Sequence, residues 1–145
     1  FVLTDEAVST ALDNGITTVA LRPPSDSLMS GYSALVHLLP DSLGGPIIEQ
    51  DTLDLQLSIE GTLYTVASKT KRDTDRMKRL YRFRDIVRDI GESHPNTFER
   101  NGRENAVERA VRHRIPLYIL VDDAMGFMQA RQVVQPLDTP IYFGR

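Results

Sequence analysis

The sequence contains no cysteine, which excludes disulfide bonds, thiolate metal sites and cysteine nucleophiles. Histidine is scarce, with only His37, His94 and His113 in the chain. No two of them stand at the i, i+2 spacing of a strand or the i, i+4 spacing of a helix that would bring two rings to one metal ion. His37 lies in an apolar run, where a hydrogen-bonded structural role is the simpler interpretation. We therefore assign no metal ligand in this chain.

Long apolar runs are also missing. The longest, residues 115–121, has the length of a strand and falls far short of the ~20 residues that a membrane-spanning helix needs. Hydrophobic residues make up 41% and charged residues 26% of the chain, proportions that are ordinary for a soluble globular protein. Neither this composition nor the absence of cysteine distinguishes a cytoplasmic from an exported protein.

The sequence begins with Phe1 and shows no positively charged stretch followed by an apolar one, as a secretory leader would. Its 145 residues suit one modest domain or a part of a larger one. We therefore expect residues 1–145 to be a single α/β segment cut from a larger domain.

Basic residues are nearly absent from the first half of the chain. Residues 1–68 contain one, Arg22, against nine acidic residues, whereas residues 69–114 hold fourteen of the seventeen lysines and arginines. A solvated helical face is the simpler interpretation of this basic helical region, residues 73–114, and a surface for an acidic partner is the alternative. Aspartates alternate with the basic residues and the chain is acidic overall, which argues against nucleic acid as a partner.

The order of the expected elements indicates an α/β fold with parallel βα units. Continuous β-branched or apolar runs predict buried strands at 16–21, 115–121 and 141–143, which we expect to lie side by side and parallel. Apolar residues at three- and four-residue spacings predict helices over 73–90, 103–113 and 124–134, and an N-cap with a Gly15 stop predicts a helix before the first strand. Residues 22–61 are rich in turns and form a loop or hairpin insertion, with short strands over 33–39 and 52–59 and a turn at residues 44–46. The alternation of leucine with polar residues over 53–59 indicates a half-buried strand.

Two sets of residues are weak candidates for a site. Asp122 and Asp123 directly follow the expected strand 115–121, where α/β proteins hold ligands, although Asp123 can equally cap the helix that follows. The loop after strand 16–21 offers hydroxyl groups and a carboxylate to a polar substrate or an anion, from Ser25, Asp26, Ser30 and Tyr32. The loop matches neither GxxxxGK[ST] nor GxSxG, so it is not a P-loop and Ser30 has no nucleophile context.

Two stretches resemble the imidazolonepropionase-like amidohydrolases. Residues 15–19 (GITTV) and the loop 24–36 occupy the places of a GVTTV strand and a PGSxNxxxGxxAVV loop in that family, and residues 105–144 follow the layout of its later strand–helix–strand region. The resemblance implies a segment from the interior of a metal-dependent-hydrolase TIM barrel, with zinc or another divalent metal possible in the full-length parent. It also implies histidine ligands within residues 118–122 and near residues 142–144, where this sequence has none.

Three hypotheses remain open. The chain is an amidohydrolase-like barrel segment without the metal-ligand histidines, acting as a non-catalytic or assembly part of a larger protein. Alternatively it belongs to a metal-dependent hydrolase of C–N bonds whose ligands lie elsewhere, or it is a binding module that uses the basic helical region. In the first case the remainder of the parent chain, or other subunits, complete the sheet, and we expect the isolated residues to be poorly soluble or oligomeric because strand edges stay unpaired.

Overall fold

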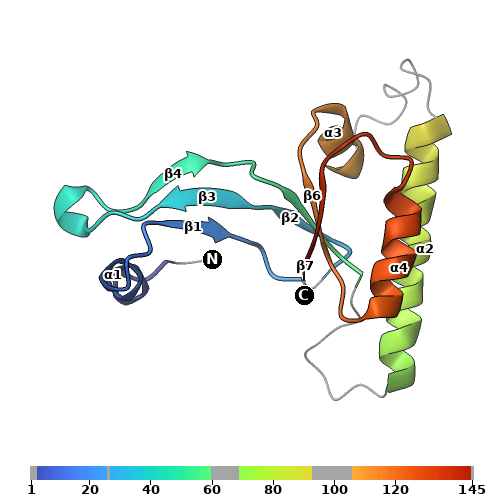
Figure 1. Cartoon of the computed structure of the whole chain (residues 1–145), viewed down its shortest axis with the longest axis horizontal. Coiled ribbons are helices and arrows are strands. Elements are labelled where there is room, and N and C mark those ends of the chain that lie inside the picture. The colour runs from blue at the N-terminus through green and yellow to red at the C-terminus, as the bar shows by residue number, and fades with distance from the viewer. Residues whose placement is uncertain (1–2, 26, 60–68, 93–105, 145) are drawn as a thin grey trace.

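The computed structural model describes residues 3–25, 27–59, 69–92 and 106–144. In these residues the chain forms a helix-covered sheet from which a narrower three-stranded sheet projects (Figure 1). The helices are α1 (Asp5–Asp13), α2 (Lys69–Glu92), α3 (Ala106–Arg112) and α4 (Ala124–Val134), with a short 3-10 turn η1 (Asp41–Leu43). The strands are β1 (Thr18–Leu21), β2 (Met29–Tyr32), β3 (Ala34–His37), β4 (Ile47–Gln50), β5 (Leu55–Ser58), β6 (Leu117–Leu120) and β7 (Ile141–Gly144).

The main sheet has the order β2-β5-β6-β7. β5, β6 and β7 run parallel, with Leu55 opposite Leu117 and Leu117 opposite Ile141, whereas β2 pairs antiparallel with β5. The parallel arrangement of strands 115–121 and 141–143 around the helix 124–134 is therefore confirmed. It makes this half of the chain a mixed α/β structure.

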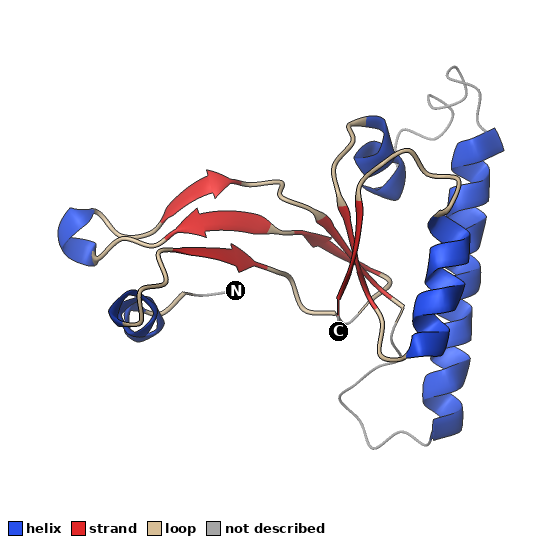
Figure 2. Cartoon of the chain, in the orientation of Figure 1, coloured by secondary structure: helices blue, strands red, loops and turns tan. Residues whose placement is uncertain are grey.

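One face of the main sheet packs against α2, α3 and α4 (Figure 2). Every second residue of β5 and β6 points into this core, which also receives Phe83 and Val87 from α2, Val107 from α3 and Ala130 from α4. Phe83 and Val107 are fully buried. Burial of these apolar side chains holds the helices on the sheet.

The projecting sheet has the order β1-β3-β4, with all neighbours antiparallel. Our expectation that residues 16–21 form a parallel strand beside 115–121 was wrong, because β1 pairs with β3, Val19 opposite Val36. The run is β-branched, and such a run fits an antiparallel strand as well as a parallel one. Val8 of α1 covers this sheet by packing with Val36 and Leu38.

A single long hairpin joins the two sheets. The strand formed by β2 and β3 pairs with the strand formed by β4 and β5, and hydrogen bonds from Ser33 N to Asp54 O and from Leu53 N to Ser33 O, both 2.8 Å, continue the pairing between the sheets. The turn at residues 44–46 thus connects β3 to β4 at the far end of the projecting sheet. Residues 55–58 lie beyond the projecting sheet and form a strand of the main sheet.

The strand expected over 53–59 is present as β5, but the expectation that it is half-buried was wrong. All four residues of β5 are buried, including the polar residues Gln56 and Ser58. Gln56 lies on the face away from the helices, whereas Ser58 Oγ accepts a hydrogen bond of 3.3 Å from Arg79 of α2. The segment after β1 covers this second face, where Gln56 Nε2 donates a hydrogen bond of 2.9 Å to the carbonyl oxygen of Pro23. Within the described ranges no helix is both long and apolar enough to cross a membrane.

Candidate functional site at the carboxyl ends of the parallel strands

The loop from β6 to α4 carries the two aspartates that the sequence singles out. The guanidinium of Arg76 on α2 pairs with both, at 2.7 Å from Asp123 Oδ2 and 3.9 Å from Asp122 Oδ1. It also lies 3.8 Å from a third carboxylate oxygen, Asp73 Oδ1. The Arg76 side chain is largely buried, with 14% of its surface exposed. A partly buried guanidinium among three carboxylates is a strong local charge interaction, and the cluster remains acidic overall.

Asp123 is the N-cap of α4. Its Oδ1 accepts a hydrogen bond of 2.6 Å from the backbone N–H of Gly126. This bond and the Arg76 guanidinium hold the pKa of Asp123 below its ordinary value, because both favour the charged carboxylate. Asp123 thus has the capping role that the sequence allows beside a ligand role.

Asp122 lies beside an open hollow of ≈ 620 Å³ at the ends of β6 and β7. Phe127 and Phe143 form its apolar wall and pack edge to face, with ring centroids 4.8 Å apart. Asp122 Oδ1 is buried and accepts no hydrogen bond from any described residue. The hollow therefore has an aromatic wall beside a carboxylate whose Oδ1 lies 3.9 Å from Arg76 without a hydrogen bond.

The residues at these strand ends do not fit a zinc ion. Among the described residues there is no group of three or more histidines, cysteines, aspartates or glutamates that could hold a metal. His37 lies on β3 in the projecting sheet and bonds to Thr18 Oγ1 at 3.2 Å, and His113 follows α3, whereas His94 lies outside the described residues. A divalent ion bound by Asp122 and Asp123 would lie close to the Arg76 guanidinium, which pairs with the same carboxylates. It would have to displace Arg76, since two cations at such close range repel each other.

A second polar group lies on the sheet face away from the helices. The register sets Gln56, Tyr118 and Tyr142 side by side across β5, β6 and β7. The Arg22 guanidinium lies 4.1 Å above the Tyr118 ring and pairs with Asp54 at 3.2 Å. Arg22 Nε and Gln56 Oε1 are buried there and bond to no described group.

This group also anchors the junction of the two sheets. Asp54 accepts a hydrogen bond of 2.5 Å from Ser33 Oγ at the corner of the hairpin, and both residues are buried. A chain of contacts therefore runs from Ser33 through Asp54 and Arg22 to Tyr118. None of these residues is predicted as a site residue from the sequence. The one feature of the sequence that sets any of them apart is that Arg22 is the single basic residue among residues 1–68.

Tyr118 also explains why a glycine ends β7. A Cβ built on Gly144 would overlap the Tyr118 hydroxyl and ring.

The loop residues proposed as substrate contacts do not converge. Tyr32 bonds through its hydroxyl to the carbonyl oxygen of Ala106 at 3.4 Å, on the helix-covered side of the sheet. Ser30 Oγ donates to Ser27 O at 3.4 Å within the turn. Ser25 lies on the segment that follows Arg22, and Asp26 lies outside the described residues. Ser30 and Tyr32 thus bond to separate parts of the chain.

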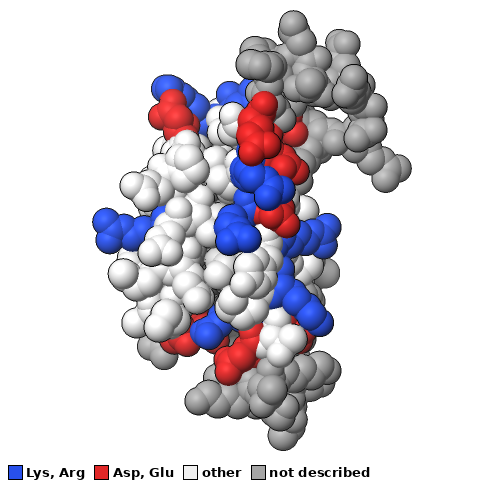
Figure 3. Space-filling model, turned by 90° about the vertical axis from the view of Figure 1, so that its right-hand side faces the viewer, with Lys and Arg blue, Asp and Glu red and all other residues white. Residues whose placement is uncertain are grey.

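The described part of the basic helical region is a mixed-charge surface. Figure 3 shows acidic and basic side chains interspersed over the face that α2 and α4 present. Arg88, for example, lies 3.4 Å from both Asp85 and Asp89. Such exposed pairs contribute little to stability, and this pattern fits the solvated helical face.

Comparison with known proteins supports a fold and no more. No protein-family model matches the chain, and no curated sequence matches it significantly. The crystal structure of an amidohydrolase from Thermotoga maritima MSB8 superposes on 95% of the chain with a TM-score of 0.69, at 17% sequence identity. The chain spans 39% of the length of that protein. The described residues therefore form an amidohydrolase-like α/β fold.

Proposed function

We propose that the chain is part of an amidohydrolase-like fold in a larger protein and serves there as a non-catalytic or assembly segment. The strand-end positions that face the hollow carry Asp122, Phe143 and Gly144, and the two carboxylates are engaged by Arg76 and by α4. The engagement of Asp122 and Asp123 by Arg76 is the observation that carries this proposal.

Arg76 and a divalent metal ion would compete for the same two carboxylates, Asp122 and Asp123. Arg76 belongs to the chain and needs no binding step, so a metal ion has to overcome both its charge and the loss of its hydrogen bond to Asp123. Recruiting Asp123 would also remove the N-cap of α4, which costs about 1 kcal/mol. At the strand ends this leaves Asp122 alone, and a single carboxylate is a weak site for a divalent ion in water.

Zinc retention by the full chain tests the proposal. We expect the chain, after exposure to zinc and dialysis, to retain far less than one zinc ion per molecule by elemental analysis. Replacing both Asp122 and Asp123 by alanine leaves that value unchanged, as does the control Asp51→Ala on an exposed loop. Stoichiometric zinc that disappears only in the double variant overturns the proposal and supports a metal-dependent hydrolase of C–N bonds.

A further inference from the structure

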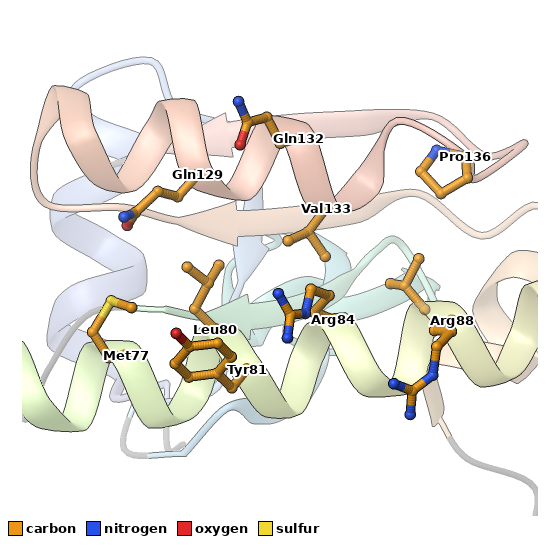
Figure 4. Close-up of a pocket in the computed structure, with 10 residues that line it drawn as sticks. Met77, Leu80, Tyr81, Arg84, Arg88, Gln129, Gln132, Val133 and Pro136 are labelled. Atoms are coloured by element: carbon orange, nitrogen blue, oxygen red, sulfur yellow. The ribbon is translucent and has the colours of Figure 1, made fainter.

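The outer surface contains a groove between α2 and α4 of ≈ 450 Å³. Its lining comes from one stripe of each helix: Met77, Leu80, Tyr81, Arg84, Val87 and Arg88 from α2, and Gln129, Gln132, Val133 and Pro136 from the α4 side. Figure 4 shows Met77 and Gln129 at one end of the groove and Arg88 and Pro136 at the other. The two helices therefore run in the same direction along its walls.

The size and shape of the groove suit a helix. The stripe from Met77 to Arg88 extends about 16 Å along α2, which corresponds to about three turns of helix. Leu80 and Val133 point into the space between the walls, and Tyr81 beside them is 50% exposed. Side chains at i, i+3, i+4 and i+7 of an amphipathic helix fit such an apolar groove between two helices.

The polar lining of the groove has one sign of charge. It includes Arg84 and Arg88, and none of its described residues is acidic, although the whole chain has a net charge of −3. Arg88 pairs with Asp85 and Asp89, whereas Arg84 lies over the Tyr81 ring at 5.0 Å from its centroid. The ring holds the Arg84 guanidinium at the groove without neutralising its charge.

An unsatisfied acceptor lies in the opposite wall. Gln129 Oε1 is buried and bonds to no described group. A buried acceptor of this kind is stabilised when a ligand donates a hydrogen bond to it. The groove thus offers an apolar floor and a cation on one wall, with the amide of Gln129 on the other.

We infer that the groove docks an amphipathic helix of a partner protein, with apolar side chains on the floor, a carboxylate beside Arg84 and a polar donor beside Gln129. This proposal does not depend on the absence of metal at the strand ends. Failure of the zinc test leaves it intact, and its own failure leaves the non-catalytic proposal intact.

A synthetic helix tests the inference on the full chain. The probe is a fluorescent amphipathic peptide of about four turns, with leucines at i, i+3, i+4 and i+7 and glutamates flanking them. Fluorescence anisotropy should show saturable binding that weakens at least about tenfold for Arg84→Glu, because like charges then meet at the groove. Arg82→Glu makes the same charge change on an exposed part of α2 outside the groove and should leave binding unchanged.

A charge swap separates specific docking from general stickiness. A peptide with lysines in place of the glutamates should bind Arg84→Glu more tightly than it binds the original chain. Equal effects of the Arg84 and Arg82 changes, or no saturable binding with circular dichroism showing both variants folded, overturn the inference. Self-association of the chain that is lost in Arg84→Glu also overturns it, since a second copy would then be the occupant.

Discussion

At the scale of single residues, the contact between Asp54 and its two partners links the sheets. Asp54 accepts from buried Ser33 and pairs with Arg22, while Arg22 stacks on Tyr118. Only 6% of the Asp54 side-chain surface is exposed to solvent. Buried groups that lose such a partner remain desolvated without compensation.

We therefore expect Asp54→Ala to lower the free energy of unfolding by about 2 kcal/mol, because Ser33 and Arg22 lose their acceptor. Urea unfolding of the full chain followed by circular dichroism measures this change. Asp51→Ala, on an exposed loop close in sequence, should change stability by less than about 0.5 kcal/mol. Equal effects of the two substitutions would show that the Asp54 contacts contribute nothing.

Gly144 offers a second residue-scale prediction. A methyl group at this position overlaps Tyr118, so Gly144→Ala should destabilise the chain by about 1–3 kcal/mol through overpacking. Gly91, near the end of α2, has open space around it, and Gly91→Ala should stabilise the helix by up to about 1 kcal/mol. Thermal unfolding of the two variants should therefore move in opposite directions, and a stabilising Gly144→Ala contradicts the close approach.

At the scale of elements, helix ends show where local sequence suffices. The sequence predicts that the first helix ends at Gly15. In the structure Gly15 follows α1 with φ 77°, and the backbone N–H of Ile16 donates a hydrogen bond to Ala11 O. Arg114 adopts φ 53° after α3 with the matching bond from Ile115 N to Ala110 O, although an arginine gives no signal for this conformation.

The N-cap of α4 makes a pH-dependent prediction. Asp123→Ala should cost about 1 kcal/mol at neutral pH. The pKa of Asp123 is lowered in the folded chain, so its stabilisation is present above the ordinary carboxyl pKa and is lost as pH falls through the lowered value. Urea unfolding across this acidic range should show the difference between wild type and Asp123→Ala shrinking as the pH drops.

Asp123→Asn is the matched control for that experiment. Asparagine retains a capping oxygen and does not titrate, so this variant should keep most of the stability at neutral pH and lose the pH-dependent part. A difference between Asp123→Ala and wild type that is constant from neutral to acidic pH contradicts a charged cap.

At the scale of the whole molecule, unpaired strand edges dominate the expected behaviour. Within the described residues β7 pairs on one side only, with β6, and β4 is one of the two edge strands of the projecting sheet. Ile48 on β4 is 64% exposed and Tyr142 on β7 is 56% exposed. Exposed apolar edges favour pairing with another chain.

We expect these 145 residues alone to self-associate as their concentration rises, measured by sedimentation velocity. A lysine on the edge responsible should reduce the association, since a charge on an edge strand opposes pairing. Ile48→Lys tests β4 and Tyr142→Lys tests β7, so the two variants identify the edge. A sharply melting monomer at every concentration contradicts the expectation.

Much of the second half of the fold was predictable from sequence. The spacing of apolar residues predicted α4 at its observed bounds, and the apolar runs around it predicted β6 and β7 as parallel neighbours. The site was predictable only in part. The sequence alone shows that Asp122 and Asp123 follow a strand. Arg76, however, lies 47 residues before Asp123 in the chain, and no local pattern indicates the contact between Arg76 and Asp123.

The sequence by itself therefore determined the helices, the positions of β1, β3, β5, β6 and β7, and the absence of cysteine and of clustered histidine, because propensity, periodicity and composition are local properties. It did not predict β2 or β4. Only the tertiary structure decided that β1 pairs with β3, that β5 is covered on both faces, and that Arg22 and Arg76 occupy the polar sites. These outcomes depend on contacts between distant segments. The same β-branched run fits either sheet, and the competition among partners for burial and hydrogen bonds selects one.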